Sequence, residues 1–225
     1  MISLQSMCMK NETKVAIFFD LDGTLWDALI PLMDSWNEAM KINNKKYRFD
    51  MNTMKSFMGL TPEETAKIGF PDVDLKEGMR LFNICLDAEI TYLAKHPGKI
   101  YPFEKETLSI LMNKYPLYII SNCGKGYIED YLNALDMNKY FKDHVCVGDT
   151  GLEKWQNIMF LQKREGIDRV IYIGDTIKDK MESEKAKVDF IHASYGFGVI
   201  NNCEFSIDSL DQLDGCITKV LEKVN

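Results

Sequence analysis

The sequence has little that would indicate a membrane, secreted or nucleic-acid-binding protein. No apolar run approaches the length needed to cross a membrane. Residues 1–14 lack the charged start and apolar block of a signal peptide, so we interpret them as a leader before the first strand. The net charge is −7, whereas nucleic-acid binding usually requires a basic face. We therefore expect a cytoplasmic protein with no membrane and no nucleic-acid partner.

The chain also lacks a framework of paired or metal-binding cysteines. Its six cysteines form no Cys-x-x-Cys pair and its three histidines are far apart, so a zinc site is disfavoured and reduced thiols are expected. What the chain does have is 225 residues with 46% hydrophobic side chains, which is enough for one core and a smaller accessory unit. This composition is compatible with a monomer and with a homodimer.

Short apolar runs that precede polar or glycine-containing turns predict buried strands. They lie at residues 15–19, 117–120, 145–147, 170–173 and 190–192. Segments with helical periodicity lie between or after the later runs, at residues 127–135, 155–164, 179–186 and 210–224. Strands that alternate with helices predict an α/β fold, a Rossmann-like parallel sheet with helices on both faces.

One block, from about residue 27 to residue 99, shows no convincing strand. Helices are predicted there at residues 33–40, 52–58, 62–68 and 75–94. We therefore predict an α/β core domain of residues 1–26 and 100–225 with an inserted helical cap domain of residues 27–99. Ligands of open α/β sheets bind beyond the carboxyl ends of the strands, where this insertion begins, so the cap is placed to cover the site as a lid.

Two aspartates directly follow the first predicted strand, in the segment Asp-Leu-Asp-Gly-Thr-Leu at residues 20–25. Side chains two residues apart in an extended chain point to the same side, so Asp20 and Asp22 would repel each other unless a cation lies between them. Gly23 permits the sharp turn that follows. Such a pair suits phosphate chemistry, in which one carboxylate attacks phosphorus and the other transfers protons. A plain β-turn is the alternative.

This segment, with Asp27, resembles the first motif of the haloacid dehalogenase (HAD) superfamily in its phosphatase branch. The second motif of the superfamily is a strand that ends in Ser or Thr, and Ser121 fits it. Ser121 and Asn122 are followed by glycines and a predicted helix, which would supply a hydroxyl and free backbone N–H groups for a phosphate. Ser-Asn is also ordinary turn material.

The third motif is a lysine before the fourth strand. Lys154 fits best and Lys163 is a weaker rival. Many members of the superfamily have proline after this lysine, whereas this chain has Trp155, so the start of the helix is expected to differ. A lone lysine at a helix start is usually only solvated.

The fourth motif is a strand that ends in acidic residues, and Gly-Asp-Thr-x-x-Asp at residues 174–179 matches it. Asp175 can bind a hard ion such as Mg²⁺, which prefers oxygen ligands. Asp179 would lie one helical turn further on, as a ligand or as support for one. Asp179 can also be explained as a charge favoured at a helix N-terminus.

The segments at residues 121–129 and 193–198, together with the helical insertion, are similar to the phosphoglycolate phosphatase-like branch. The helix after Asp179 departs from that branch, because Glu182, Ser183 and Lys187 stand where small residues and a glycine are common. The departure concerns packing and not the chemistry.

The resemblance implies a Mg²⁺-dependent phosphatase that acts on a small phosphomonoester through an aspartyl-phosphate. Asp20 would be the nucleophile and Asp22 the acid and base. The metal would bind Asp20, Asp175, the backbone carbonyl of Asp22 and, directly or through water, Asp179. The predicted catalytic and substrate-binding positions are completed by Thr24, Gly59 on the cap turn at residues 57–60, Ser121, Asn122 and Lys154.

Alternatives remain open at this stage. A phosphomutase similar to beta-phosphoglucomutase would use the same aspartates, whereas a dehalogenase would need neither Mg²⁺ nor Asp22. A non-catalytic regulatory protein that binds a phosphate ligand would be expected to have lost the nucleophile or a metal ligand, but every expected position is filled. The partner is expected to be a small phosphorylated metabolite, such as phosphoglycolate, a sugar phosphate, a nucleotide or pyrophosphate.

Overall fold

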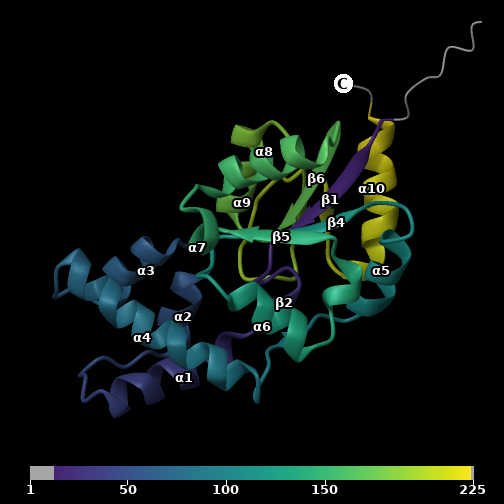
Figure 1. Cartoon of the computed structure of the whole chain (residues 1–225). Coiled ribbons are helices and arrows are strands. Elements are labelled where there is room, and N and C mark those ends of the chain that lie inside the picture. Colours follow the sequence, from purple (N-terminus) through teal and green to yellow (C-terminus); the bar gives the residue numbers. More distant parts are fainter. Residues whose placement is uncertain (1–12, 224–225) are drawn as a thin grey trace, which may run out of the picture.

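The computed structural model describes residues 13–223, so most of the predicted leader lies outside the described residues. Its centre is a six-stranded parallel sheet with the strand order β5-β4-β1-β6-β7-β8 (Figure 1). The strands are β1 (Val15–Phe19), β4 (Leu117–Ser121), β5 (Asp143–Cys146), β6 (Arg169–Gly174), β7 (Asp189–Ala193) and β8 (Ser206–Ile207). The predicted α/β fold with a Rossmann-like parallel sheet is confirmed.

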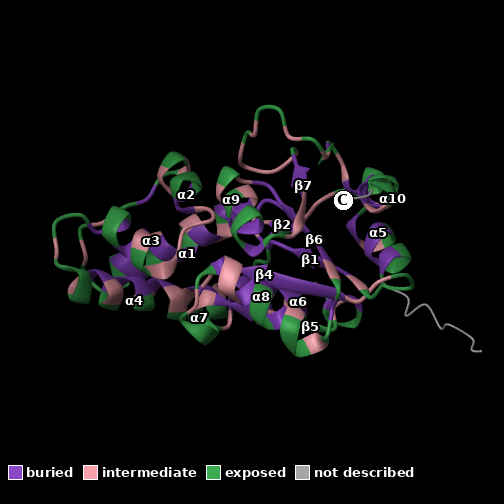
Figure 2. Ribbon diagram, turned by 90° about the horizontal axis from the view of Figure 1, so that it is seen from above, coloured by how far each residue is buried: buried purple, intermediate pink, exposed green. Residues whose placement is uncertain are grey.

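Helices cover both faces of the sheet because successive strand residues alternate between them. Ala16 and Phe18 of β1 face a cluster that includes Ile158 and Leu161 of α8. Ile17 and Phe19 face the other cluster, to which α5, α6 and α10 contribute. Figure 2 shows the buried strands between helices whose outer sides are exposed. The core helices are α5 (Glu104–Leu111), α6 (Tyr127–Ala134), η1 (Asn138–Tyr140), α7 (Val147–Thr150), α8 (Lys154–Glu165), α9 (Ile177–Ala186), η2 (Leu210–Gln212) and α10 (Leu213–Glu222).

A group of helices that lies beside the sheet in Figure 1 forms the helical insertion. Its members are α1 (Leu29–Ile42), α2 (Met51–Phe57), α3 (Pro62–Gly69) and α4 (Leu75–Leu93). Aromatic rings fill its interior, where Trp36 packs against Phe49, Phe57 and Phe82. The insertion packs on the core where α4 contacts α6.

The ends of the insertion differ from the prediction that this block contains no strand. β2 (Trp26–Asp27) and β3 (Lys99–Ile100) pair with each other in antiparallel orientation, so the two connections to the core run side by side. Strands of two residues are too short to leave a periodic pattern in the sequence. The proposed domain boundaries fall within this pair and remain a prediction.

A second difference concerns Val147, which was expected at the end of a strand. β5 instead ends at Cys146, and Val147 begins the short helix α7.

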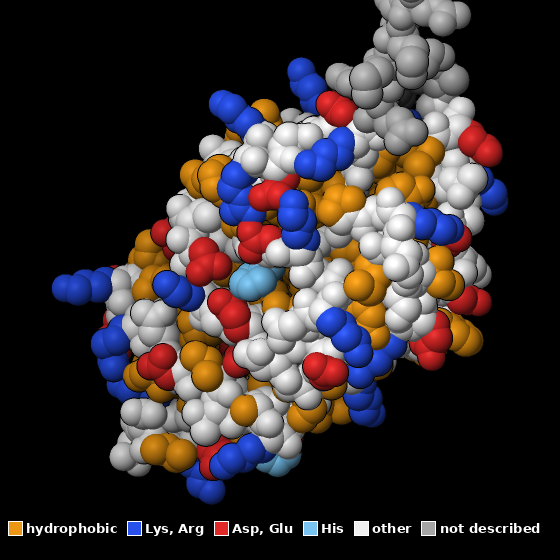
Figure 3. Space-filling view, turned by 45° about the vertical axis from the view of Figure 1, so that its right-hand side comes forward, with side chains coloured by type: hydrophobic (Ala, Val, Ile, Leu, Met, Phe, Trp, Pro, Cys, Tyr) orange, Lys and Arg blue, Asp and Glu red, His pale blue; other side chains and the backbone are white. Residues whose placement is uncertain are grey.

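None of the helices in the described part of the chain combines the length and apolar character needed to span a membrane. On the face shown in Figure 3, basic and acidic side chains are interspersed.

Candidate active site

The site lies at the carboxyl edge of the sheet, where three neighbouring strands end. β1 lies between β4 and β6 in a parallel arrangement. The residues at or just beyond these strand ends, Asp20, Ser121 and Asp175, are therefore brought to one edge although the sequence separates them widely. All three are buried.

Lys154 extends from the first residue of α8 into this edge and is only 1% exposed. Its Nζ donates to Asp20 Oδ1 at 2.8 Å and to Asp179 Oδ1 at 2.6 Å. Burial acts to lower the pKa of Lys154, but the charges of Asp179 and Asp20 outweigh burial and raise it well above its usual value. Lys154 is therefore a cation held between two carboxylates, whereas the rival Lys163 is exposed.

Asp20, Asp175 and Asp179 form a buried acidic cluster in which one oxygen from each lies within 4.8 Å of the others. Burial and the charge of Asp179 raise the pKa of Asp20 to about 7, against the opposing effect of Lys154. Burial and both neighbouring carboxylates also raise the pKa of Asp175 well above its usual value. The cluster thus holds more negative charge than Lys154 neutralises.

Local backbone structure fixes two members of this cluster. Thr176 and Asp179 form a capping box at the start of α9, in which Asp179 Oδ2 accepts from the Thr176 N–H at 3.0 Å. Asp175 Oδ2 accepts from the Phe197 N–H at 2.6 Å. Gly23, at φ +79°, lies so close that a Cβ there would be 2.2 Å from Asp175 Oδ2, which explains the glycine.

Asp22 lies beside the cluster and receives two hydrogen bonds on the same oxygen. Trp26 Nε1 donates to Asp22 Oδ1 at 3.1 Å and the Tyr127 hydroxyl donates to it at 2.8 Å. Burial raises the pKa of Asp22 to about 6, although both hydrogen bonds lower it. The sequence did not assign roles to Trp26 and Tyr127, and the only signal was that Tyr127 falls within the branch-like segment at residues 121–129.

The remaining residues that were predicted to bind the substrate are Asn122, Gly59, Ser121 and Thr24. Asn122 Nδ2 donates to the backbone carbonyl of Gly59 at 2.8 Å, which connects the core to the helical insertion. Its Oδ1 is buried without a hydrogen-bond partner among the described residues. Ser121 Oγ accepts from the Cys123 N–H at 3.3 Å. The Thr24 hydroxyl is buried and likewise has no partner in the described chain.

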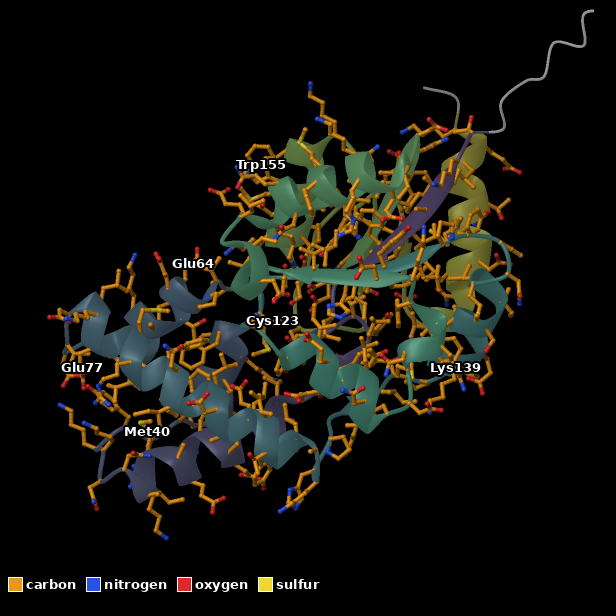
Figure 4. All side chains as sticks on the ribbon, viewed as in Figure 1. Met40, Glu64, Glu77, Cys123, Lys139 and Trp155 are labelled. Atoms are coloured by element: carbon orange, nitrogen blue, oxygen red, sulfur yellow. The ribbon has the colours of Figure 1, made fainter. Side chains whose placement is uncertain are left out.

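A cavity of about 70 Å³, partly open to solvent, lies between the helical insertion and this edge. Figure 4 shows Cys123, one of its lining residues, at the junction of the insertion and the core. The predicted site residues that line it are Asp20, Asp22, Gly59, Ser121 and Asn122. Those that do not line it are Thr24, Lys154, Asp175 and Asp179. Sequence reasoning missed Glu89 of α4 and Trp36 of α1, which also line it.

Comparison with known proteins assigns the family. The model of the haloacid dehalogenase-like hydrolases matches residues 17–193, which include the whole acidic cluster. The chain belongs to the haloacid dehalogenase-like hydrolase family. The resemblance carried by the four motifs is thereby confirmed, and with it the expectation of a hydrolase.

Curated relatives of this haloacid dehalogenase-like hydrolase carry the name phosphoglycolate phosphatase, as does the branch that the sequence resembles. The protein of that name from Colwellia psychrerythraea is 26% identical over 206 residues, with 84% of this chain and 88% of the relative covered. The one from Vibrio parahaemolyticus is 24% identical over 224 residues, with 91% of this chain and 96% of the relative covered.

Solved structures share the fold. A haloacid dehalogenase-like hydrolase from Streptococcus pneumoniae has a TM-score of 0.77 at 20% identity, with 91% of this chain and 98% of that chain covered. A structure described as a predicted phosphatase from Clostridium acetobutylicum has a TM-score of 0.74 at 21% identity, with 92% of this chain and 99% of that chain covered.

The acidic cluster of this haloacid dehalogenase-like hydrolase fits a Mg²⁺ ion. Its donors are carboxylate oxygens, which Mg²⁺ prefers. Asp175 Oδ1 is buried without a hydrogen-bond partner in the described structure, and the mutual repulsion of the carboxylates would be relieved by a cation. Both oxygens of Asp179 already accept hydrogen bonds, from Lys154 and Thr176. Asp20 and Asp175 are therefore the better candidates for direct ligands.

Proposed function

We propose that this chain is a Mg²⁺-dependent phosphatase that hydrolyses a small phosphomonoester. The observation that carries the proposal is the buried pair of Lys154 and Asp20 beside Asp175, at the end of a cavity open to solvent. A cytoplasmic location and a small phosphorylated metabolite as the ligand belong to the same proposal. The names of the curated relatives support the phosphatase activity.

Asp20 is the proposed nucleophile. One of its carboxylate oxygens forms a bond to phosphorus while the bond from phosphorus to the ester oxygen breaks, which leaves an aspartyl-phosphate on Asp20. Lys154 holds the carboxylate through Oδ1. A Mg²⁺ ion bound by Asp20 and Asp175 would offset the negative charge that gathers on the phosphoryl oxygens.

Asp22 is the proposed acid and base. Its raised pKa of about 6 keeps a usable fraction protonated near neutral pH. Because Trp26 and Tyr127 both donate to Oδ1, Oδ2 is left to carry the proton that passes to the departing alkoxide. The ionised Asp22 then accepts a proton from water, which attacks phosphorus, releases phosphate and restores Asp20.

Ser121, Asn122 and Gly59 are proposed to surround the ester near the entrance to the cavity. The Ser121 hydroxyl and the Asn122 side chain line the cavity beside Asp20 and Asp22. The bond from Asn122 to Gly59 holds the turn between α2 and α3 over the site. The hydroxyl of Thr24 is buried and lies outside the cavity, so it could contribute to substrate binding only indirectly.

The proposal is tested by measuring phosphate release from a panel of phosphomonoesters with Mg²⁺ and with a chelator. We expect Mg²⁺-dependent release by the natural chain. Asp20→Asn should reduce turnover by at least about 1,000-fold, because the nucleophile is lost. Its thermal midpoint should not fall by more than a few degrees, because a carboxylate disfavoured by burial is replaced with a neutral group.

Asp149→Asn is a matched control, because Asp149 is exposed on α7. It should retain full turnover. Full turnover of Asp20→Asn, or release that is insensitive to the chelator, would contradict the proposal. Transfer of the phosphoryl group back to the substrate, without release of phosphate, would favour a phosphomutase instead.

A further inference from the structure

The cavity that adjoins Asp20 contains acids but no cations. Its acidic residues are Asp20, Asp22 and Glu89, and none of the described residues that line it is Lys, Arg or His. Lys154 does not line it and is bound between Asp20 and Asp179. The charge of one phosphate can be met at Lys154 and the proposed metal site. A second anionic group on the same ligand would find no positive partner in the cavity walls.

Glu89 extends from α4 and lines the cavity, yet it is only 5% exposed. Its Oε1 accepts a hydrogen bond from Trp36 Nε1. Burial, together with the charges of Asp22 and Asp130, raises the pKa of Glu89 to about 8, although the hydrogen bond from Trp36 opposes the change. A buried acid that the proposed chemistry does not use needs a partner to be favourable in the ionised form.

The wall around Glu89 is aromatic and apolar. The centroid of the Trp36 ring lies 5.6 Å from that of Phe57 and 5.8 Å from that of Phe82. All three rings line the cavity, and Leu32, Met54 and Leu86 line it beside them. The faces of aromatic rings attract cations, and apolar walls accept methyl and methylene groups. An acid among aromatic rings is therefore a suitable site for an alkylammonium group.

We propose that the leaving group of the substrate carries a primary or quaternary ammonium, and that Glu89 is the residue that selects it. The substrate class would be the phosphate ester of an amino alcohol. This inference rests on the proposed phosphatase function. The phosphate would lie at Asp20 and the ammonium against Glu89 and the aromatic wall. When the ammonium binds, Glu89 loses its proton to solvent. A carboxylate on the leaving group, as in phosphoglycolate, would lie against the acid of Glu89, with no cationic side chain in the cavity lining to pair with it, and would be disfavoured.

The test compares kcat/KM with Mg²⁺ for phosphoethanolamine, phosphocholine, glycerol 3-phosphate and phosphoglycolate. We expect the amino-alcohol esters to exceed phosphoglycolate by about tenfold or more. Glu89→Gln should reduce this ratio on the order of tenfold. Asp87→Asn is the matched control, because Asp87 is exposed on the same helix and does not line the cavity, and it should leave the ratio unchanged.

Glu89→Asp separates charge selection from a purely structural role. It keeps the carboxylate, so we expect it to retain a larger ratio than Glu89→Gln even where both lower the thermal midpoint. A preference for phosphoglycolate or glycerol 3-phosphate, or equal ratios in the two Glu89 variants, would overturn the inference. Absence of phosphate release from the amino-alcohol esters, while other phosphomonoesters of the panel are hydrolysed, would also overturn the inference, whereas absence of release from the whole panel would contradict the phosphatase function itself.

Discussion

Tyr127 illustrates how a single hydroxyl can set the pH range of the proposed chemistry. Its hydrogen bond to Asp22 favours the ionised carboxylate and so lowers the pKa of Asp22. Tyr127→Phe removes this bond and leaves the ring in place. The pKa of Asp22 should rise above its value of about 6, so the limb of the pH profile that Asp22 governs should move to higher pH. The profile of kcat/KM between about pH 5 and pH 9 measures the change.

Tyr131→Phe provides the control for this prediction. Tyr131 is buried on the same helix, but its hydroxyl donates to Glu104 and not to Asp22. Its removal should leave the limb where it is in the natural chain. A limb that stays in place in Tyr127→Phe, or that moves equally in both variants, would contradict the role given to Tyr127.

Residues that follow predicted strands could be found from the sequence, whereas residues that reach the site by packing could not. Asp20 and Asp175 follow apolar runs, and parallel strands bring such positions to one edge. Glu89 and Tyr127 belong to helices whose contact with the site depends on how α4 packs on α6. Apart from the place of Tyr127 in the branch-like segment at residues 121–129, nothing in their own segments indicates that contact. Which of these residues act in catalysis remains a prediction.

At the scale of elements, α3 and α9 are joined by an ion pair between the helical insertion and the core. Lys178 Nζ lies 2.6 Å from Glu64 Oε2, and Figure 4 shows Glu64 on the part of the insertion nearest the core. The pair is partly exposed, so its loss should change the free energy of unfolding by less than about 1 kcal/mol. If the insertion closes over the substrate, the same loss weakens the closed state and Lys178→Ala should raise KM by about two- to fivefold.

Lys180→Ala is the matched control, because Lys180 pairs with Glu184 within α9 and does not reach the insertion. Both variants should have similar thermal midpoints, and only Lys178→Ala should change KM. Equal KM values in the two variants would show that the ion pair does not hold the insertion over the site.

Most of the longer elements were predictable from the sequence, although α5, with eight residues, was missed. The long apolar or periodic segments that became β1, β4, β6 and α8 were recognised, because each has enough residues to show a period. β2, β3 and β8 have two residues each, and α7 has four. The three short strands are defined by their pairing partners elsewhere in the chain. α7 is a single helical turn, which is also too short to show a period.

At the scale of the whole molecule, several buried carboxyl groups have raised pKa values, so they keep their protons at a pH where exposed carboxyl groups are ionised. Burial raises the pKa of Glu104 from 4.5 to about 8, although a hydrogen bond from Tyr131 opposes the change. The folded chain therefore holds this proton between about pH 4.5 and pH 8, whereas the unfolded chain releases it. Unfolding releases a proton over this range, so the free energy of unfolding should fall by about 1.4 kcal/mol per pH unit for this group.

Glu89, with a pKa of about 8, and Asp20, with a pKa of about 7, contribute in the same direction. The thermal midpoint of the metal-free protein should therefore fall as the pH rises from about 5 to 8. Glu104→Gln should make this decline shallower, because the titrating group is gone, even if the loss of one buried acceptor lowers the midpoint at every pH. Glu106→Gln, at an exposed position on the same helix, should keep the original slope. Parallel slopes for both variants and the natural chain would show that Glu104 is already ionised in the folded state.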